Sequence, residues 1–208
     1  MERAKRIDAR LPLALLRAMQ HQDTPPELMP NEPVSAFFPQ RFGLSGVVEE
    51  QIRYFERLSR GRRRVDEAQV QALLELVSRR SDAGAVLESA GRELAKLHFT
   101  GPFGRLRRWR RRLPRPFRRR AAARSLRALH GNFFVAAALS VETGSLEIQA
   151  TDALTARVGE SGAACRLYGS LAASLLELSG LGRLAVVHSQ CQRRGEPRCI
   201  WQVEEQEV

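Results

Sequence analysis

Three cysteines and one histidine near the carboxyl terminus are the residues of this chain with the clearest chemical potential. They are Cys165, His188, Cys191 and Cys199, and they include every cysteine among the 208 residues. Two residues separate His188 from Cys191, and seven separate Cys191 from Cys199, in a stretch that otherwise predicts a β-hairpin. Zinc prefers thiolate and imidazole ligands in a closed tetrahedron. We therefore predict a Zn²⁺ site, against the alternative of three scattered buried thiols and an ordinary surface histidine.

The elements that must position these ligands follow from hydrophobic periodicity. Helical spacing of apolar residues predicts helices over residues 47–59, 66–77, 81–97 and 165–178. Runs of strand-forming residues predict two hairpins, 133–141 with 146–151 and 184–190 with 199–203. The predicted fold class is α+β, with helices packed on one face of a four-stranded antiparallel sheet and one helix inserted between its two hairpins.

This layout predicts that the four ligands meet. Cys165 lies in the first turn of the last helix, where the helix dipole favours a thiolate. His188 and Cys191 end one strand and Cys199 begins the next, so the turn between them brings these residues together. With four protein ligands the metal has no open position for a water molecule. We therefore expect a structural and not a catalytic zinc.

The amino-terminal residues 1–45 are predicted to form an arm ahead of one zinc-stapled domain, residues 46–208. The arm combines a short amphipathic helix around Leu11, Leu15 and Met19 with a proline-rich segment over 23–40. We find no export signal and no apolar run near the roughly 20 residues that cross a bilayer. The expected location is the cytoplasm, with peripheral attachment to the inner membrane as an alternative.

A basic segment, residues 105–127, carries twelve arginines and no acid, whereas the rest of the chain is close to neutral. We call it the arginine strip. Pro114 and Pro116 are predicted to break any continuous helix there. One interpretation is a solvated connection whose arginines reflect a GC-rich genome; the others are contact with an anionic membrane and, less favoured, with nucleic acid. The candidate contact residues are Arg107, Arg108, Trp109, Arg110, Arg111, Arg112, Arg118, Arg119 and Arg120.

The ligand pattern resembles the 4-vinyl-reductase-type domain. The resemblance lies in a cysteine at a helix start, a metal ligand two residues before a second cysteine, and a G-E-P-x-C string closing the hairpin at Cys199. It covers roughly residues 80–204, with Ala90-Gly91-Arg92 similar to the family's first helix motif. Such domains occur in aromatic-responsive activators and in bacteriochlorophyll 4-vinyl reductase accessory proteins, and TRAPP subunits share the fold. In the aromatic sensors a glutamate takes the place of His188, and both are zinc ligands.

The resemblance implies a dimeric bacterial domain that encloses a hydrophobic or amphipathic small molecule and acts without catalysis as a sensor, carrier or accessory protein. Only the zinc ligands are carried over from the family. Phe133, Phe134 and Tyr168 are candidates to line the cavity, with plain core packing as the alternative. Two other functions stay open: an enzyme or accessory factor in tetrapyrrole (bacteriochlorophyll) synthesis, and docking to a membrane or nucleic acid through the arginine strip.

Overall fold

The computed structural model describes residues 6–23, 45–99, 114–133, 136–142, 145–151, 153–158 and 162–204. Within these residues the chain forms helices and two antiparallel sheets, so the predicted α+β class is confirmed. The helices are α1 (Arg10–Asp23), α3 (Ser45–Arg60), α4 (Glu67–Ser78), α5 (Ala83–Phe99), α7 (Arg115–Phe133) and α8 (Arg166–Leu178). The strands are β1 (Arg6–Asp8), β2 (Arg64–Asp66), β3 (Ala136–Glu142), β4 (Ser145–Thr151), β5 (Ala185–Gln190) and β6 (Cys199–Glu204).

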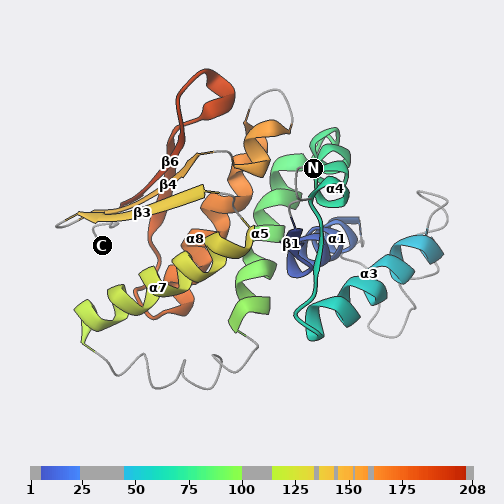
Figure 1. Ribbon diagram of the computed structural model, residues 1–208, viewed down its shortest axis with the longest axis horizontal. Helices are drawn as coiled ribbons and strands as arrows, with labels where there is room; N and C mark the ends of the chain where they lie inside the picture. Colours follow the sequence, from blue (N-terminus) through green and yellow to red (C-terminus); the bar gives the residue numbers. More distant parts are fainter. Residues whose placement is uncertain are drawn as a thin grey trace, which may run out of the picture.

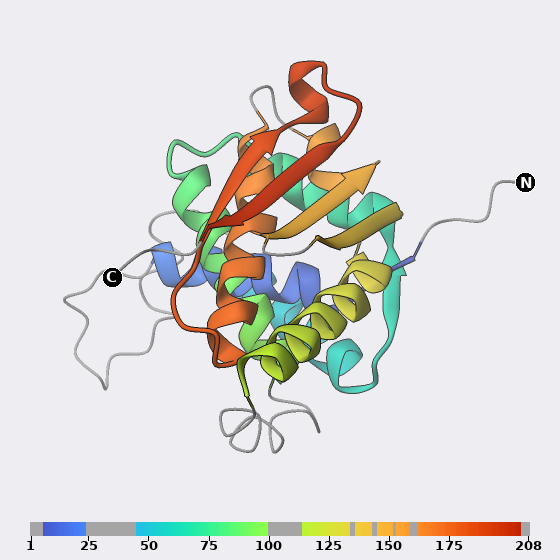
Figure 2. The ribbon, with the colours of Figure 1, turned by 90° about the vertical axis from the view of Figure 1, so that its left-hand side faces the viewer.

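The larger sheet has the strand order β3-β4-β6-β5, and every neighbouring pair is antiparallel. The two hairpins therefore join through β4 and β6, the last strand of each. Figure 2 shows α8 crossing behind this sheet, with α5 beside it in the helical layer. Helix α8 follows the first hairpin and precedes the second, as the sequence predicts.

Helices α5 and α8 approach each other closely at Gly91. A Cβ atom added at Gly91 would lie 2.4 Å from the backbone oxygen of Leu167 and 2.8 Å from the backbone nitrogen of Leu171. Only glycine allows the two backbones to come so near. The Ala90-Gly91-Arg92 motif therefore has a packing role, which holds the start of α8 against α5.

Residues 6–23, which belong to the predicted arm, pack within the main body of the fold. Strand β1 pairs with β2, and α1 packs against α5 and α3. Leu11, Leu13, Leu15 and Leu16 are all buried in the main core. They surround the helix instead of forming one stripe, which is the pattern of a helix enclosed on all sides. None of the described helices is long and apolar enough to cross a membrane.

Helix α7 runs through the carboxyl-terminal half of the arginine strip, where the sequence predicted no helix, and it begins directly after Pro114. Pro114 precedes α7, and its carbonyl accepts hydrogen bonds from the N–H groups of Phe117 and Arg118. Pro116 lies in the first turn, where a helix needs no N–H donor. The helix continues to Phe133, so Phe133 ends a helix instead of opening a strand.

Candidate metal centre

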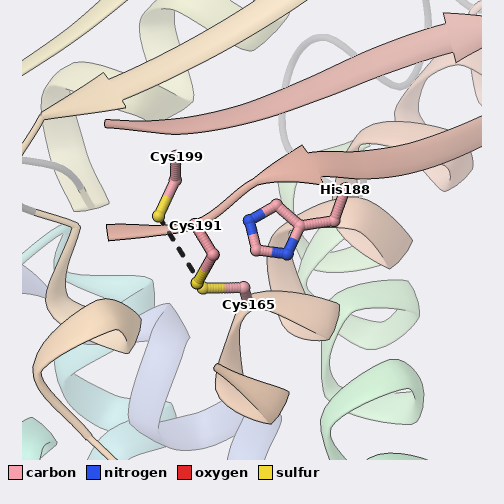
Figure 3. A group of neighbouring side chains, drawn as sticks. All are labelled: Cys165, His188, Cys191 and Cys199. Carbon is pink, nitrogen blue, oxygen red and sulfur yellow. Dashed lines mark hydrogen bonds between the residues drawn. The ribbon is translucent and has the colours of Figure 1, made fainter. Parts of the chain in front are cut away.

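The ligand atoms of Cys165, His188, Cys191 and Cys199 all lie within 4.8 Å of one another. Figure 3 shows the imidazole and the three thiols pointing toward a common centre, with Cys165 on the helical side and the other three on the hairpin. The sulfur atoms of Cys165 and Cys199 are 4.0 Å apart. Tetrahedral zinc with Zn–S bonds of about 2.3 Å separates two sulfur ligands by about 3.8 Å. The four residues thus have the chemistry and the spacing to hold a metal ion.

An irregularity in β5 places His188 and Cys191 on the same face of the hairpin. Residues three apart in a regular strand point to opposite faces. The pairing with β6 shifts between His188, which faces Trp201, and Gln190, which faces Ile200. This β-bulge inserts Ser189 as an extra residue. The alternation of side chains between the two faces therefore shifts by one position, and Cys191 points to the same face as His188. As a result His188, Cys191 and Cys199 all face α8.

The turn after β5 brings Cys191 back toward Cys199. The carbonyl of Cys191 accepts hydrogen bonds from the N–H groups of Arg194 (2.9 Å) and Glu196 (3.3 Å). Gly195 ends this short turn at φ +94°, in the left-handed region that favours glycine. The N–H of Gln192 points back at the sulfur of Cys199, 3.4 Å away. Such a donor stabilises a thiolate at Cys199.

Cys165 comes to the site from the other layer of the fold. It ends a short 3₁₀ turn, Ala163–Cys165, and is the N-cap residue of α8. Its sulfur lies 3.5 Å from the hydroxyl oxygen of Thr155, and its carbonyl accepts a hydrogen bond from the indole N–H of Trp201 at 3.3 Å. The first contact holds the side chain of Cys165 and the second holds its backbone. A metal ligand held in this way keeps its orientation.

Trp201 positions the ring of His188, and the Nε2 atom of that ring is available as a metal ligand. The two rings stack with centroids 4.8 Å apart and planes 17° from parallel. The Nε2 atom of His188 is buried and has no hydrogen-bond partner among the described residues. A buried polar atom without a partner costs free energy, and a metal ion at the centre of the cluster would satisfy it.

The buried thiols of Cys165 and Cys199 shift each other's pKa in opposite directions. A hydrogen bond with the Cys165 thiol, followed by interactions with His188 and with the Gln192 N–H, lowers the pKa of the Cys199 thiol well below its ordinary value. The same hydrogen bond and burial raise the pKa of Cys165. Cys199 is therefore the favoured thiolate, whereas the sequence predicted the helix dipole to favour Cys165. The difference arises because the two sulfur atoms lie 4.0 Å apart, and Cys199 is the one that accepts the N–H of Gln192.

Three supporting residues were not foreseen from the sequence. Trp201 could have been found, because it lies two positions after Cys199 in a strand and so shares its face. Gly162 has φ +70°, and a Cβ atom there would lie 2.7 Å from the sulfur of Cys191. Thr155 gives no signal in the sequence that connects it with Cys165, because a contact between two such segments depends on the tertiary fold.

The other predicted site residues do not join this cluster. Tyr168 is buried in the core, with its ring edge against Trp201 at 5.7 Å between centroids. Phe133 is the last residue of α7, and Phe134 lies outside the described residues. Arg118, Arg119 and Arg120 lie in the first two turns of α7. The remaining predicted contact residues, Arg107 to Arg112 with Trp109, also lie outside the described residues.

An open pocket of about 370 Å³ adjoins the cluster. Val186 and Trp201 of the sheet and Gly169 and Ala173 of α8 supply its apolar wall. A polar rim is formed by one residue of α5 and two residues of α8, and two of the metal-ligand residues complete the lining. The rim and ligand residues are Glu88, Arg166, Ser170, Cys165 and His188.

Comparison of the chain with protein-family models, with curated proteins and with solved structures finds no match in any of the three.

Proposed function

We propose that Cys165, His188, Cys191 and Cys199 bind one structural Zn²⁺, and that the domain around it binds a hydrophobic or amphipathic small molecule in the manner of 4-vinyl-reductase-type domains. The observation that carries the metal assignment is the convergence of all four ligand atoms within 4.8 Å. Three thiolates and one imidazole suit tetrahedral zinc better than the oxygen-preferring Mg²⁺ or Ca²⁺.

The zinc would act as a staple between the two layers of the fold. Cys165 starts α8, whereas the other ligands belong to the hairpin of β5 and β6. A tetrahedral ion held by all four protein ligands keeps no position for substrate or water, which supports a structural role. The same ion would hold α8 at a fixed distance from the sheet and so preserve the pocket between them.

The pocket beside the cluster is the proposed site for the small molecule. Its volume of about 370 Å³ lies at the lower end of the range for ligand pockets, which favours a compact ligand over a tetrapyrrole macrocycle. The indole of Trp201 offers a flat apolar surface, and the ion pair of Arg166 with Glu88, at 3.5 Å, offers polar contacts at the rim. Because Cys165 and His188 line the same pocket, occupancy and metal geometry would influence each other.

Native mass spectrometry with elemental analysis, on protein purified gently without chelator, tests both parts. We expect one zinc per chain and, in a fraction of the molecules, a retained organic ligand. The Cys191→Ser variant should lose the metal. Preparations that contain no stoichiometric zinc, even after supplementation under reducing conditions, would contradict the metal assignment.

Substitution in the pocket separates the small-molecule proposal from the metal proposal. Ala173→Leu on α8 adds volume in the pocket lining and replaces no metal ligand. We expect this variant to keep its zinc and to lose the retained ligand. Arg183→Leu, an exposed position after α8 that lies outside the pocket lining, is the matched control and should keep both. Equal ligand content in parent, Ala173→Leu and Arg183→Leu proteins would contradict the pocket assignment while leaving the zinc intact.

A further inference from the structure

Helix α7 presents a row of arginines on its outward side. Phe117, Arg120, Arg124 and Arg127 are spaced by three, four and three residues, so they share one face of the helix, and all four are exposed. We call this row the α7 arginine face. On the opposite side Ala122, Leu126 and Leu129 are buried and anchor the helix to the core. Figures 1 and 2 both show α7 on the outside of the fold.

Within the sequence of α7 itself, these like charges stand at unfavourable spacings. Arg124 lies four residues after Arg120 and three before Arg127, spacings at which like charges repel. The first turn of α7 contains no acid, although the positive end of the helix dipole lies at this end and favours one. No aspartate or glutamate occurs anywhere in residues 115–133. A charge pattern that is locally unfavourable is expected where a surface serves binding.

Helix α3 carries three arginines at the same spacings, Arg53, Arg57 and Arg60, but its sequence also provides acids one turn away. Arg53 pairs with Glu49 and Arg60 with Glu56, each acid one turn before its arginine. That arrangement is the favourable one for an isolated helix. Arginine content alone therefore does not explain α7, since a codon bias would act equally on both helices.

We infer that the α7 arginine face docks on an anionic membrane surface. Guanidinium groups attract the phosphate and carboxylate groups of acidic lipids, and the attraction grows with the number of arginines held near the surface. Phe117, with 53% of its surface exposed at one end of the row, adds an aromatic ring that suits the headgroup region. Arg120 to Arg127 spans about 10 Å along an exposed helix, so the charges can reach a flat surface together.

The exposed ring of Phe117 beside the arginines favours a membrane over nucleic acid. Nucleic acid is nevertheless a polyanion, and its binding is therefore measured as a separate arm of the test.

The test uses the full chain and co-sedimentation with phosphatidylcholine vesicles, either pure or containing phosphatidylserine. The main variant carries Arg120→Gln, Arg124→Gln and Arg127→Gln together. Glutamine keeps the helix propensity, so the melting temperature should not fall. The matched control carries Arg53→Gln, Arg57→Gln and Arg60→Gln on α3, which removes the same charge from another exposed helix. A third variant replaces the three α7 arginines by lysine and retains the charge.

We expect the parent protein to bind the phosphatidylserine vesicles and not the pure phosphatidylcholine vesicles. The α7 glutamine variant should lose about 100-fold in partition coefficient, because each basic residue near an anionic surface contributes about 1 kcal/mol. The lysine variant and the α3 control should stay close to the parent. Binding should weaken as salt rises, since the Debye length shortens from about 10 Å at 0.1 M to about 3 Å at 1 M.

Three results would overturn the inference. The first is a parent protein that does not bind phosphatidylserine vesicles at low salt. The second is an equal loss of vesicle binding in the α7 and α3 glutamine variants, which would show that binding depends on the net charge of the protein and not on α7. The third is tighter binding to duplex DNA or to RNA than to vesicles, abolished by the α7 glutamine variant, which would assign the face to nucleic acid.

Discussion

The indole of Trp201 contacts two predicted metal ligands at once: its ring stacks on His188 at 4.8 Å, and its N–H donates to the carbonyl of Cys165 at 3.3 Å. One side chain thereby orients a ligand from the hairpin and a ligand from the helical layer. Trp201 is almost completely buried, so its position is set by packing on all sides. Groups of this kind, which support the ligands without touching the metal, commonly tune metal affinity.

Replacement of Trp201 by phenylalanine should therefore weaken metal binding without unfolding the protein. Phenylalanine keeps an aromatic ring beside His188 but removes the hydrogen bond to the Cys165 carbonyl, at a cost of about 0.5–1.5 kcal/mol. We expect zinc affinity to fall about 10–100-fold, measured by competition with a chromophoric chelator. Tyr54→Phe, an exposed aromatic residue on α3, is the control and should match the parent. Unchanged affinity in Trp201→Phe would show that the hydrogen bond has no part in orienting Cys165.

Loss of one thiolate should destabilise the whole fold. Cys191→Ser removes a ligand that is buried, and metal binding energy is part of folding energy in such sites. We expect the melting temperature to fall by at least about 10 °C, since each kcal/mol corresponds to about 2–4 °C in a chain of this size. Differential scanning calorimetry in reducing buffer provides the measurement.

Chelation supplies the control for this prediction. Parent protein stripped of metal should melt near the temperature of Cys191→Ser, and chelator should have no effect on the variant. A variant that melts far below the stripped parent would attribute the loss to packing of the thiol and not to the metal.

Features of this site that follow from residue type and spacing could be predicted from the sequence, whereas features that depend on tertiary packing could not. The four ligands were predictable because all the cysteines of the chain fall in one group with one nearby histidine. The bulge at Ser189 was not, because the register between β5 and β6 depends on packing against α8. The burial of α1 was missed because Leu11, Leu15 and Met19 suggested a single stripe, although Leu13 and Leu16 are buried as well. Helix α7 was missed because prolines that break a helix can equally stand at the start of one, as Pro114 and Pro116 do here.

Gly162 should be as necessary to the cluster as a ligand. Alanine there would place a Cβ atom 2.7 Å from the sulfur of Cys191 and would also strain a backbone held at φ +70°. We expect Gly162→Ala to lower zinc affinity markedly and to reduce stability by more than about 1 kcal/mol. Gly195→Ala is the matched control, because it has the same kind of φ, +94°, but no atom within 4 Å of an added Cβ. It should lose stability through backbone strain and retain its zinc; equal zinc affinity in the two variants would remove the steric argument.

The contact between α5 and α8 allows a comparison of two glycines within one helix. Gly91→Ala would push a Cβ atom into the backbone of Leu167, which cannot yield without moving α8, and overpacking of this kind costs about 1–3 kcal/mol. Gly84→Ala meets only the guanidinium end of Arg166 at 2.9 Å, a flexible group that can move aside. Alanine is the better helix former by about 1 kcal/mol, so Gly84→Ala should be neutral or stabilising.

Urea denaturation of the zinc-loaded proteins would measure the two glycine variants on one scale. Because α8 begins at Cys165, displacement by Gly91→Ala should also move that ligand and weaken zinc binding, whereas Gly84→Ala should leave it unchanged. If both variants lost stability equally, the close approach at Gly91 would not be what holds α8 in place. If Gly91→Ala lost stability but kept its zinc affinity, the hairpin must follow α8 when the helix moves, and the four ligands would behave as one rigid unit.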